Sequence, residues 1–384
     1  SFMQPIVIIG TGLAGFNTVK EFRKLDKETP IVMLTADDGR NYSKPMLSAG
    51  FTKEKTADDL CMATPEKVAE QFNVDVRTGV HVAGIDPQKK RVLLPDDHLD
   101  YSKLVLALGA DTWTPPLEGN AVGEVFSVND LMDYAKFRAA IEGKKTITIL
   151  GGGLIGCEFA NDLSNGGFQV QLVEPMGRCL PLLLPEAASE AVGRGLQDLG
   201  VQFHFGPLAK AVHHGDGGKL VTELSDGSKL ESDVVLSAIG LRPRIGMAKE
   251  AGLNTNRGIL TDKGLRTSAE DIFALGDCAE VEGHVLPYVL PLMASARALA
   301  KTLAGEPTDV SYGVMPVTIK TPACPVVVCP APEGSEGDWE VEADGNTVQA
   351  LFRGKDGNLL GYALTGDAVK EKMKLNKELP AVMP

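Results

Sequence analysis

The chain has 384 residues, 43% of them hydrophobic, and its 51 Asp and Glu against 38 Lys and Arg give a formal net charge of −13. This negative charge argues against binding to nucleic acid or to anionic membranes, and no apolar stretch reaches the ~18 residues that a membrane span needs. Length and composition predict a globular protein of two or three domains with a large core. Since the first apolar run begins at Ile6, we expect no signal peptide and a cytoplasmic location.

The first predicted unit is a strand, a glycine-rich turn and a helix. The apolar run 6–9 leads into Gly10-Thr-Gly-Leu-Ala-Gly15, which has the G-x-G-x-x-G spacing of dinucleotide-binding proteins. The first glycine permits the tight turn, the second lets the backbone approach a pyrophosphate, and the third lets helix and strand pack closely. The helix N-terminus then offers free N–H groups to the phosphates. The next strand, 31–34, runs into Thr35-Ala-Asp37, where an acid can hold a ribose.

The remainder of the first part reads as short strands. Segments 74–81 and 91–94 are predicted strands, and 101–110 is predicted as one buried strand because it lacks polar alternation. The proline-rich segment 111–116 follows as a stiff linker.

A second copy of the same plan begins about 140 residues after the first. The apolar run 147–150 leads into Gly151-Gly-Gly153-Leu-Ile-Gly156, between predicted helices 129–142 and 157–164. Strand 170–173 ends in Glu174, and a helix covers 186–199. The buried strand 234–240 is an apolar run that ends in glycine, as 104–109 is. One such fingerprint is weak evidence, whereas two with strand before and helix after strongly indicate two dinucleotides on one chain.

The second ribose acid favours NADH over NADPH. A carboxylate at this position bonds both ribose hydroxyls and repels a 2′-phosphate. The alternative is that Glu174 points to solvent and Arg178 reaches a phosphate.

After residue 243 the chain reads as a return to the first part. Segment 266–279 is a predicted buried strand that ends in Gly276-Asp277, and a helix follows from about residue 291. A third region, 314–384, opens with strands 316–322 and 325–328, continues with a hairpin around 354–357, and ends in a lysine-rich helix, 367–377.

The six cysteines show neither a C-x-x-C pair nor zinc spacing, so we expect no metal site. Cys324 and Cys329 have the four-residue gap of a redox disulfide, but the segment between them is strand-like. On a strand such a pair lies ~16 Å apart on opposite faces, whereas a disulfide needs Cα atoms within ~7 Å. Packing thiols are therefore expected, with a redox dithiol as the alternative.

Five segments occur in an order that resembles a known family: YSKP at 42–45, LVLALGA at 104–110, GGGLIGCEFA at 151–160, SAIGLRP at 237–243 and IFALGDCAE at 272–280. The order is similar to that of the FAD-dependent pyridine nucleotide oxidoreductases with two dinucleotide-binding domains. The segments YSKPMLS (42–48) and VTIKTPACP (317–325) are more specific and resemble the bacterial rubredoxin reductases over residues 3–384.

The resemblance implies an α/β fold with two Rossmann-like domains of the glutathione-reductase type and a small α+β C-terminal domain. The implied FAD-binding domain is discontinuous, 1–112 and 243–313. The NADH-binding domain is 113–242, and the C-terminal domain is 314–384.

The resemblance also assigns residues to the two cofactors. FAD is implied to contact Gly10, Thr11, Gly12, Leu13, Ala14, Gly15, Thr35, Ala36, Asp37, Lys44, Val82, Glu158, Asp277, Val289 and Lys320. NADH is implied to contact Gly151, Gly153, Gly156 and Glu174. Catalytic roles beside the flavin are implied for Glu158, Lys44 and Lys320.

Other readings of these residues stay open. Each lysine can be a solvated surface charge, Glu158 a favourable charge at a helix N-terminus, and Asp277 a structural N-cap. Several ferredoxin reductases of the family carry a lysine near flavin N5 four or five residues past Lys44-Pro45. Segment 46–49 here is Met-Leu-Ser-Ala, so that lysine is missing and Lys44 or Lys320 is left to substitute.

The implied activity is electron transfer from NADH through FAD to rubredoxin, one electron at a time, serving for example alkane hydroxylation or oxygen detoxification. Flavin suits this task because it accepts a hydride and releases single electrons. The alternatives are another acceptor, namely flavorubredoxin, ferredoxin or oxygen, and a non-catalytic NADH-binding signalling protein. We expect a monomer or weak oligomer that meets rubredoxin transiently. The lysines at 370, 372, 374 and 377 are either steering charges for an acidic partner or a solvated helix face.

Overall fold

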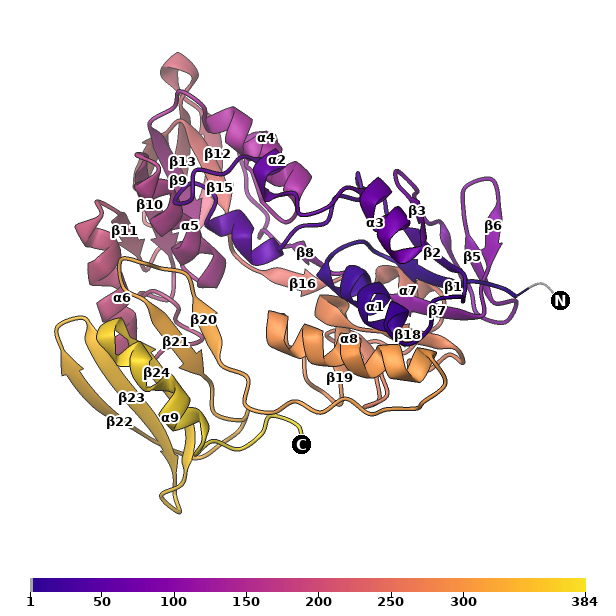
Figure 1. The fold of residues 1–384 in the computed structure, drawn as a ribbon. Helices are drawn as coiled ribbons and strands as arrows, with labels where there is room; N and C mark the ends of the chain where they lie inside the picture. The colour runs from indigo at the N-terminus through magenta and orange to yellow at the C-terminus, as the bar shows by residue number, and fades with distance from the viewer. Residues whose placement is uncertain (1–2) are drawn as a thin grey trace.

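The computed structural model describes residues 3–384 and is an arrangement of three main sheets with helices packed on them (Figure 1). The first sheet has the order β18-β7-β1-β2-β3, and every neighbouring pair in it is parallel. Its strands are β1 (Ile6–Ile9), β2 (Ile31–Leu34), β3 (Asp75–Arg77), β7 (Lys103–Leu106) and β18 (Ile272–Ala274). Because β18 joins the sheet so late in the sequence, the chain does return to its first part, as expected.

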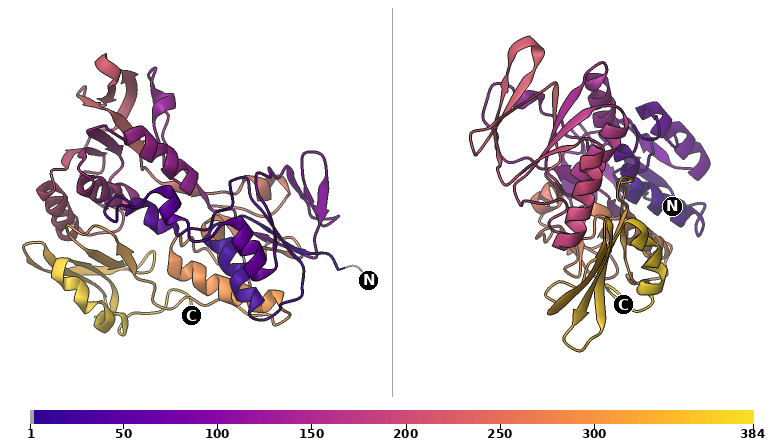
Figure 2. Two further views of the ribbon diagram at one scale, coloured as in Figure 1. Left: turned by 45° about the horizontal axis from the view of Figure 1, so that its top comes forward. Right: turned by 90° about the vertical axis from the view of Figure 1, so that its left-hand side faces the viewer.

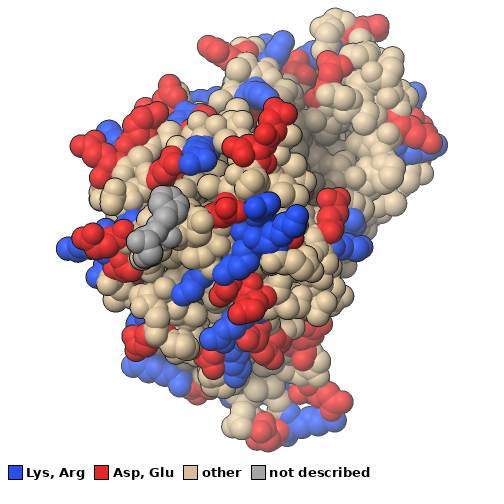
Figure 3. Space-filling view, turned by 90° about the vertical axis from the view of Figure 1, so that its right-hand side faces the viewer, with Lys and Arg blue, Asp and Glu red and all other residues tan. Residues whose placement is uncertain are grey.

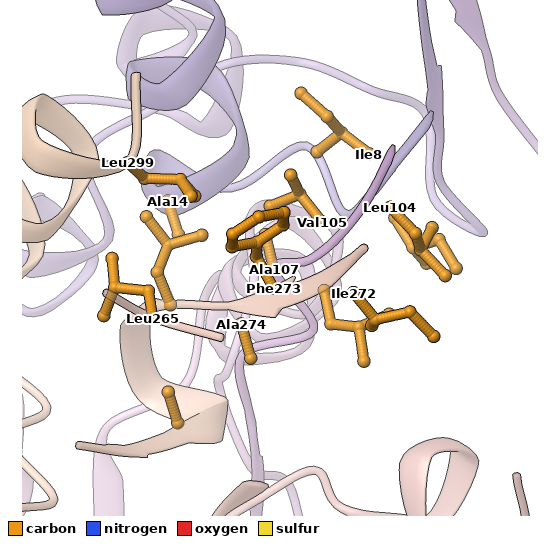
Figure 4. Packing of buried hydrophobic residues seen from close by; sticks show 14 of the residues in the cluster. Ile8, Ala14, Leu104, Val105, Ala107, Leu265, Ile272, Phe273, Ala274 and Leu299 are labelled. Carbon is orange, nitrogen blue, oxygen red and sulfur yellow. The ribbon is translucent and has the colours of Figure 1, made fainter. Parts of the chain in front are cut away.

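Helices and a small antiparallel meander complete this part of the molecule. Helices α1 (Leu13–Arg23) and α8 (Val289–Leu303) pack against each other, as the orange and indigo ribbons of Figure 1 show. Figure 4 shows the core beneath them, where Ile8, Leu104, Val105, Phe273 and Leu299 pack together. The other elements are α3 (Pro65–Phe72), α7 (Gly246–Glu250), β4 (Gly84–Asp86), β5 (Arg91–Leu93), β6 (His98–Asp100), β17 (Ile259–Thr261) and β19 (Ala279–Val281).

The second sheet repeats the plan of the first, with the parallel order β11-β10-β9-β15. Its strands are β9 (Thr146–Leu150), β10 (Gln169–Glu174), β11 (Gln202–Phe205) and β15 (Val234–Ser237). Around it lie α2 (Ala57–Leu60), α4 (Leu131–Ile141), α5 (Leu154–Asn165), α6 (Glu186–Asp198) and an antiparallel sheet of β12 (Ala209–His214), β13 (Leu220–Leu224) and β14 (Lys229–Ser232). The predicted duplication is therefore present, since β7 beside β1 corresponds to β15 beside β9.

Two antiparallel strands, β8 (Ala110–Thr112) and β16 (Leu241–Pro243), lie where the chain passes between the two parallel sheets. The prediction of one strand over 101–110 was wrong in length, because Gly109 at φ +72° interrupts the extended backbone between β7 and β8. The strand predicted over 266–279 is similarly shorter. Residues 268–271 form a bend and turn before β18, and a 3-10 turn, η4 (Gly276–Cys278), separates β18 from β19.

The third region is an antiparallel sheet with the order β20-β21-β24-β23-β22, coloured yellow and orange in Figure 2, and it packs against α6. Its strands are β20 (Val317–Ile319), β21 (Val326–Cys329), β22 (Gly337–Asp344), β23 (Thr347–Gly354) and β24 (Leu359–Thr365). The predicted hairpin at 354–357 is confirmed as the β23–β24 connection. The predicted single helix over 367–377 was wrong, since a 3-10 helix, η5 (Gly366–Glu371), precedes the short α9 (Lys372–Asn376).

The cysteines behave as packing residues. All six are free, and five of them are buried. Cys324 lies in the turn before β21 rather than on a strand, while Cys329 ends that strand. Within residues 3–384 no helix has the length and apolar character to cross a bilayer. On the face shown in Figure 3, acidic and basic side chains are interspersed, with a short streak of Lys and Arg near the centre.

Candidate functional site

The first fingerprint folds as a strand, a tight turn and a helix. Gly10 has φ +119°, and a Cβ there would overlap the Ala107 carbonyl oxygen. A Cβ at Gly15 would overlap the Gly10 carbonyl oxygen, so this position lets α1 approach β1. Gly12 differs, because a Cβ there would have no neighbouring atom within 4 Å and the space before the helix is open.

The second fingerprint has the same geometry. Gly151 has φ +107°, its Cβ would lie 2.6 Å from the Ala238 carbonyl oxygen, and a Cβ at Gly156 would overlap the Gly151 carbonyl oxygen. Gly12 and Gly153 are the N-caps of α1 and α5, and neither helix has a side-chain cap. The first N–H groups of both helices are therefore free to bind phosphate. An open space outside an uncapped helix end fits a dinucleotide pyrophosphate at both places.

Each parallel sheet places a carboxylate at or just after the end of the strand that follows its fingerprint. Oδ1 of Asp37 accepts hydrogen bonds from Thr35 Oγ1 at 2.8 Å and from Gly39 N at 2.7 Å. Thr11 Oγ1 lies at 3.5 Å from the same oxygen, so the turn and the acid are neighbours. No hydrogen bond to Oδ2 of Asp37 occurs among the residues that the structure describes, which leaves an acceptor for a ribose hydroxyl.

In the second sheet, Glu174 is buried and held from two sides. Its Oε1 accepts from Gly152 N at 3.1 Å, and its Oε2 accepts from Met176 N at 2.6 Å. The alternative that Glu174 points to solvent is wrong, since the residue is buried, and Arg178 Nη2 donates to the carbonyl oxygens of Pro181 and Leu184 within its own loop. Glu174 is thus the charged group fixed at the second fingerprint.

Lys44 and Asp277 form a partly buried group of opposite charges. Lys44 lies in η1 (Lys44–Ser48), and its Nζ donates to Asn129 Oδ1 at 2.6 Å. Burial lowers the pKa of Lys44, with the carboxylate of Asp277 acting in the opposite direction. Burial likewise raises the pKa of Asp277, opposed by the Lys44 ammonium. Asp277 is only half-buried, although its apolar sequence context suggested full burial.

A second ionic cluster joins Glu158, Lys320 and Ser48. The Glu158 side chain on α5 is 4% exposed, and its Oε1 lies 3.0 Å from Lys320 Nζ. Ser48 Oγ donates to the same Oε1 at 2.8 Å. Lys320 N donates to Oε2 at 2.7 Å. The structure therefore brings two of the three expected catalytic side chains into direct contact, while Lys44 has other partners.

The remaining expected residues occupy separate positions. Val289 begins α8, whose N-terminus has no side-chain cap, and it is exposed. Val82 is half-buried against the first core just before β4, and Ala36 is exposed beside the buried Thr35.

Sequence reasoning missed Ser48, Asn129 and Asp162. Asp162 lies one helical turn after Glu158 on α5, so helical spacing could have found it. Its carboxylate accepts from Phe51 N and Thr52 N, and burial raises its pKa against these bonds. A pocket of about 330 Å³ lies beside it, and Ser48 and Lys320 contribute to its wall.

The comparisons with known proteins agree with this geometry. Residues 4–300 match the family described as pyridine nucleotide-disulphide oxidoreductase. Residues 309–379 match a second family, described as rubredoxin binding C-terminal domain.

Full-length relatives cover the chain from end to end. It is 91% identical over 382 residues to a rubredoxin-NAD(+) reductase of Alcanivorax borkumensis, with 100% of both chains covered. It is 42% identical to a rubredoxin-NAD(+) reductase of Acinetobacter baylyi, covering 100% of this chain and 99% of the relative. Among solved structures, a ferredoxin reductase from Rhodopseudomonas palustris is 25% identical with a TM-score of 0.87, covering 98% of this chain and 96% of that one.

Proposed function

The chain belongs to the pyridine nucleotide-disulphide oxidoreductase family, and we infer that it transfers electrons from NADH through bound FAD to rubredoxin. One observation carries this conclusion. Two turns that fit dinucleotides, Gly10–Gly15 (the first cradle) and Gly151–Gly156 (the second cradle), lie on the same chain as a region, 309–379, that matches rubredoxin-binding domains. Full-length similarity to two proteins named rubredoxin-NAD(+) reductase, at 91% and 42% identity, favours rubredoxin over other acceptors.

FAD, when bound, supplies the chemistry that joins a hydride donor to a one-electron iron acceptor. We propose that the first cradle holds it. The open space at Gly12 and the free N–H groups of α1 suit its pyrophosphate, and the free oxygen of Asp37 suits its ribose. Asp277, Val82, Thr35 and Ala36 would complete the contacts.

The second cradle is proposed to hold NADH. The N-terminus of α5 after Gly153 would bind the pyrophosphate, with Gly151 and Gly156 supplying the turn and the close packing. Glu174 would accept from the ribose hydroxyls. Its fixed negative charge would repel a 2′-phosphate, and so it would select NADH over NADPH.

Three positive groups are proposed to act at the flavin: Lys44, Lys320 and the uncapped N-terminus of α8 at Val289. A positive electrostatic potential around bound FAD would stabilise the negative charge that reduction brings to it. Glu158 would orient this region from α5 and would balance the Lys320 ammonium, with which it is paired.

The proposal also includes the domain boundaries. It assigns FAD to residues 1–112 and 243–313, NADH to 113–242, and partner contact to 314–384. The first parallel sheet with α8, the second parallel sheet and the antiparallel sheet support this division. The proposal also takes the protein to be monomeric or weakly associating. It places the protein in the cytosol, since six unpaired thiols suit a reducing compartment.

Stopped-flow mixing tests the proposal. The purified yellow protein is reduced anaerobically with NADH and then mixed with oxidised rubredoxin, with ferredoxin, or with air-saturated buffer. We expect rapid bleaching of the flavin by NADH and reoxidation that is much faster with rubredoxin than with either alternative. Reoxidation by ferredoxin or oxygen at the rate seen with rubredoxin would overturn the assignment of the acceptor.

A further inference from the structure

Three segments far apart in the sequence meet at one buried carboxylate. Ser48 comes from η1, Glu158 from α5, and Lys320 from the residue after β20. Sequence separations of 110 and 162 residues from Glu158 mean that the cluster forms only in the complete fold. Lys320 also lies inside the region that matches rubredoxin-binding domains.

The hydrogen-bond directions in this cluster are determined by chemistry. An ammonium only donates and a carboxylate only accepts, whereas a hydroxyl does both. Lys320 Nζ therefore donates to Ser48 Oγ at 3.1 Å, and Ser48 Oγ donates to Glu158 Oε1 at 2.8 Å. The other acceptor near Ser48 Oγ, the Pro45 carbonyl oxygen, is farther away at 3.4 Å. Ser48 therefore bridges the two charged groups, because its hydroxyl accepts from Lys320 and donates to Glu158, which also contact each other directly.

The Lys320 ammonium also has another carboxylate nearby. Asp162 lines the same pocket of about 330 Å³ as Ser48 and Lys320, and the Lys320 charge acts on its pKa in the lowering direction. The Lys320 side chain is 28% exposed and has a long unbranched stem, so a second hydrogen bond beside the Glu158 contact restricts where its ammonium can lie. The Ser48 hydroxyl supplies that second hydrogen bond.

We propose that Ser48 is a positioning residue that holds the Lys320 ammonium against Glu158 and so fixes the cation of the C-terminal region at the flavin. The location of the flavin rests on the function proposed above. Removal of the hydroxyl leaves the ion pair but frees the ammonium to move within the pocket toward Asp162. The electrostatic potential at the flavin then changes without loss of a charged residue.

The test compares the FAD-loaded Ser48→Ala variant with two matched variants. Ser48→Thr keeps the hydroxyl. Thr52→Ala removes a hydroxyl from the wall of the same pocket. Thr52 Oγ1 accepts from the exposed Asn165 at 3.0 Å and the Thr52 side chain acts to lower the pKa of Asp162, but within the described chain it has no hydrogen bond to Lys320 or Glu158. The measurements are the midpoint potential of bound flavin by dye titration, the FAD content, and the rate of flavin reduction by NADH.

For S48A we expect a lower midpoint potential and a roughly fivefold to tenfold slower reduction by NADH, the size of one lost hydrogen bond of ordinary strength. FAD content should stay at the wild-type level, and S48T and T52A should match the wild type in all three measurements. In a double-mutant cycle, S48A combined with Lys320→Met should slow reduction by less than the product of the two single effects.

Two results would overturn the role of Ser48: an S48A protein with wild-type potential and rate, or effects of S48A and K320M that multiply. Ser48→Cys keeps the side-chain shape and replaces the hydroxyl with a weakly hydrogen-bonding thiol, and it serves in the same comparison if S48A does not fold. Failure of the proposed function looks different, because wild-type flavin would then not be reduced by NADH at all. The potential measured by dye titration would still test Ser48 in that case.

Discussion

At the scale of single residues, the glycines of each fingerprint have different tasks, and their surroundings separate them. Gly10 and Gly15 have no room for a side chain, while Gly12 has space around it and a backbone that any residue can adopt. Gly10 and Gly15 therefore serve the fold, and Gly12 leaves room for a ligand.

This difference gives the first expected outcome. Gly10→Ala should destabilise the protein by about 3 kcal/mol or more, because the methyl group meets the Ala107 carbonyl and φ is positive. Gly12→Ala should keep the wild-type unfolding free energy without cofactor but bind FAD much more weakly. Urea unfolding and FAD titration of the two variants check this, and equal FAD binding by G12A and wild type would contradict it.

Glu174 carries the second expected outcome. Glu174→Gln retains an oxygen for Gly152 N but loses the negative charge, so the fold should persist. Discrimination between NADH and NADPH, measured as the ratio of their kcat/KM values, should fall by about tenfold. Arg178→Ala is the control, since its guanidinium bonds only the carbonyl oxygens of its own loop in the described structure, and it should leave the ratio unchanged.

The sequence predicted the fingerprints and their acids because these depend on local spacing. It did not predict that Glu158, Lys320 and Ser48 touch, because that contact depends on how segments up to 272 residues apart pack. Asn129 was missed for the same reason, since its amide meets Lys44 from 85 residues away. The roles of these residues toward the cofactors remain proposals.

At the scale of elements, strands with an apolar pattern were predicted well, and the polar edge strand β22 was not found. All but one of its eight residues are exposed, so it has no buried face, but Trp339, Val341 and Ala343 alternate with acidic residues and this strand pattern was overlooked. The ends of β7 and β18 were also misplaced. Glycines with positive φ, such as Gly109 and Gly276, stop these strands, and an apolar run alone does not show where the backbone turns.

Asp233 ties elements of the second sheet together and gives a pH-dependent outcome. It accepts from Lys145 N, from Thr146 N and from Lys219 Nζ at the start of β15. Burial acts to raise the pKa of Asp233, but these hydrogen bonds outweigh it and the pKa is well below its ordinary value of 3.8. Since the folded pKa is depressed, the stabilisation is present above pH 3.8 and is lost as the pH falls through the folded value.

Asp233→Asn should therefore lower the free energy of unfolding near neutral pH by about 1–3 kcal/mol. The difference from wild type should shrink as the pH falls below about 4. Denaturant unfolding across this pH range checks it, with Asp96→Asn, a change in an exposed turn, as the control. A difference that is constant with pH would show that the charge of Asp233 is not what stabilises the sheet.

At the scale of the whole molecule, the order of the regions was predictable because the chain repeats one plan and then departs from it. The contribution of the third region to the ionic cluster at Glu158 was not predictable, because Lys320 reaches Glu158 only when the antiparallel sheet packs near α5. A net charge of −13 also means that an acidic partner must meet a local excess of positive charge.

Lys370 and Lys374, both exposed on η5 and α9, are the candidates for that local charge. Reversing both to Glu should lower the second-order rate of rubredoxin reduction several-fold at low salt and flatten its dependence on ionic strength. Flavin reduction by NADH should not change. Lys89→Glu, in an exposed turn of the small meander, should leave the rubredoxin rate as it is, and an equal loss in both variants would mean that net charge and not this site matters.

Electrons from NADH should reach rubredoxin only through flavin bound to this chain. The most direct test is an anaerobic titration of limiting NADH into catalytic amounts of the protein with excess oxidised rubredoxin, repeated with protein stripped of FAD. We expect about two rubredoxins reduced per NADH with the flavoprotein and none with the stripped protein until FAD is restored. Rubredoxin reduction by the stripped protein, or NADH consumption with no reduced rubredoxin, would show that the electrons do not pass from NADH through bound flavin to rubredoxin.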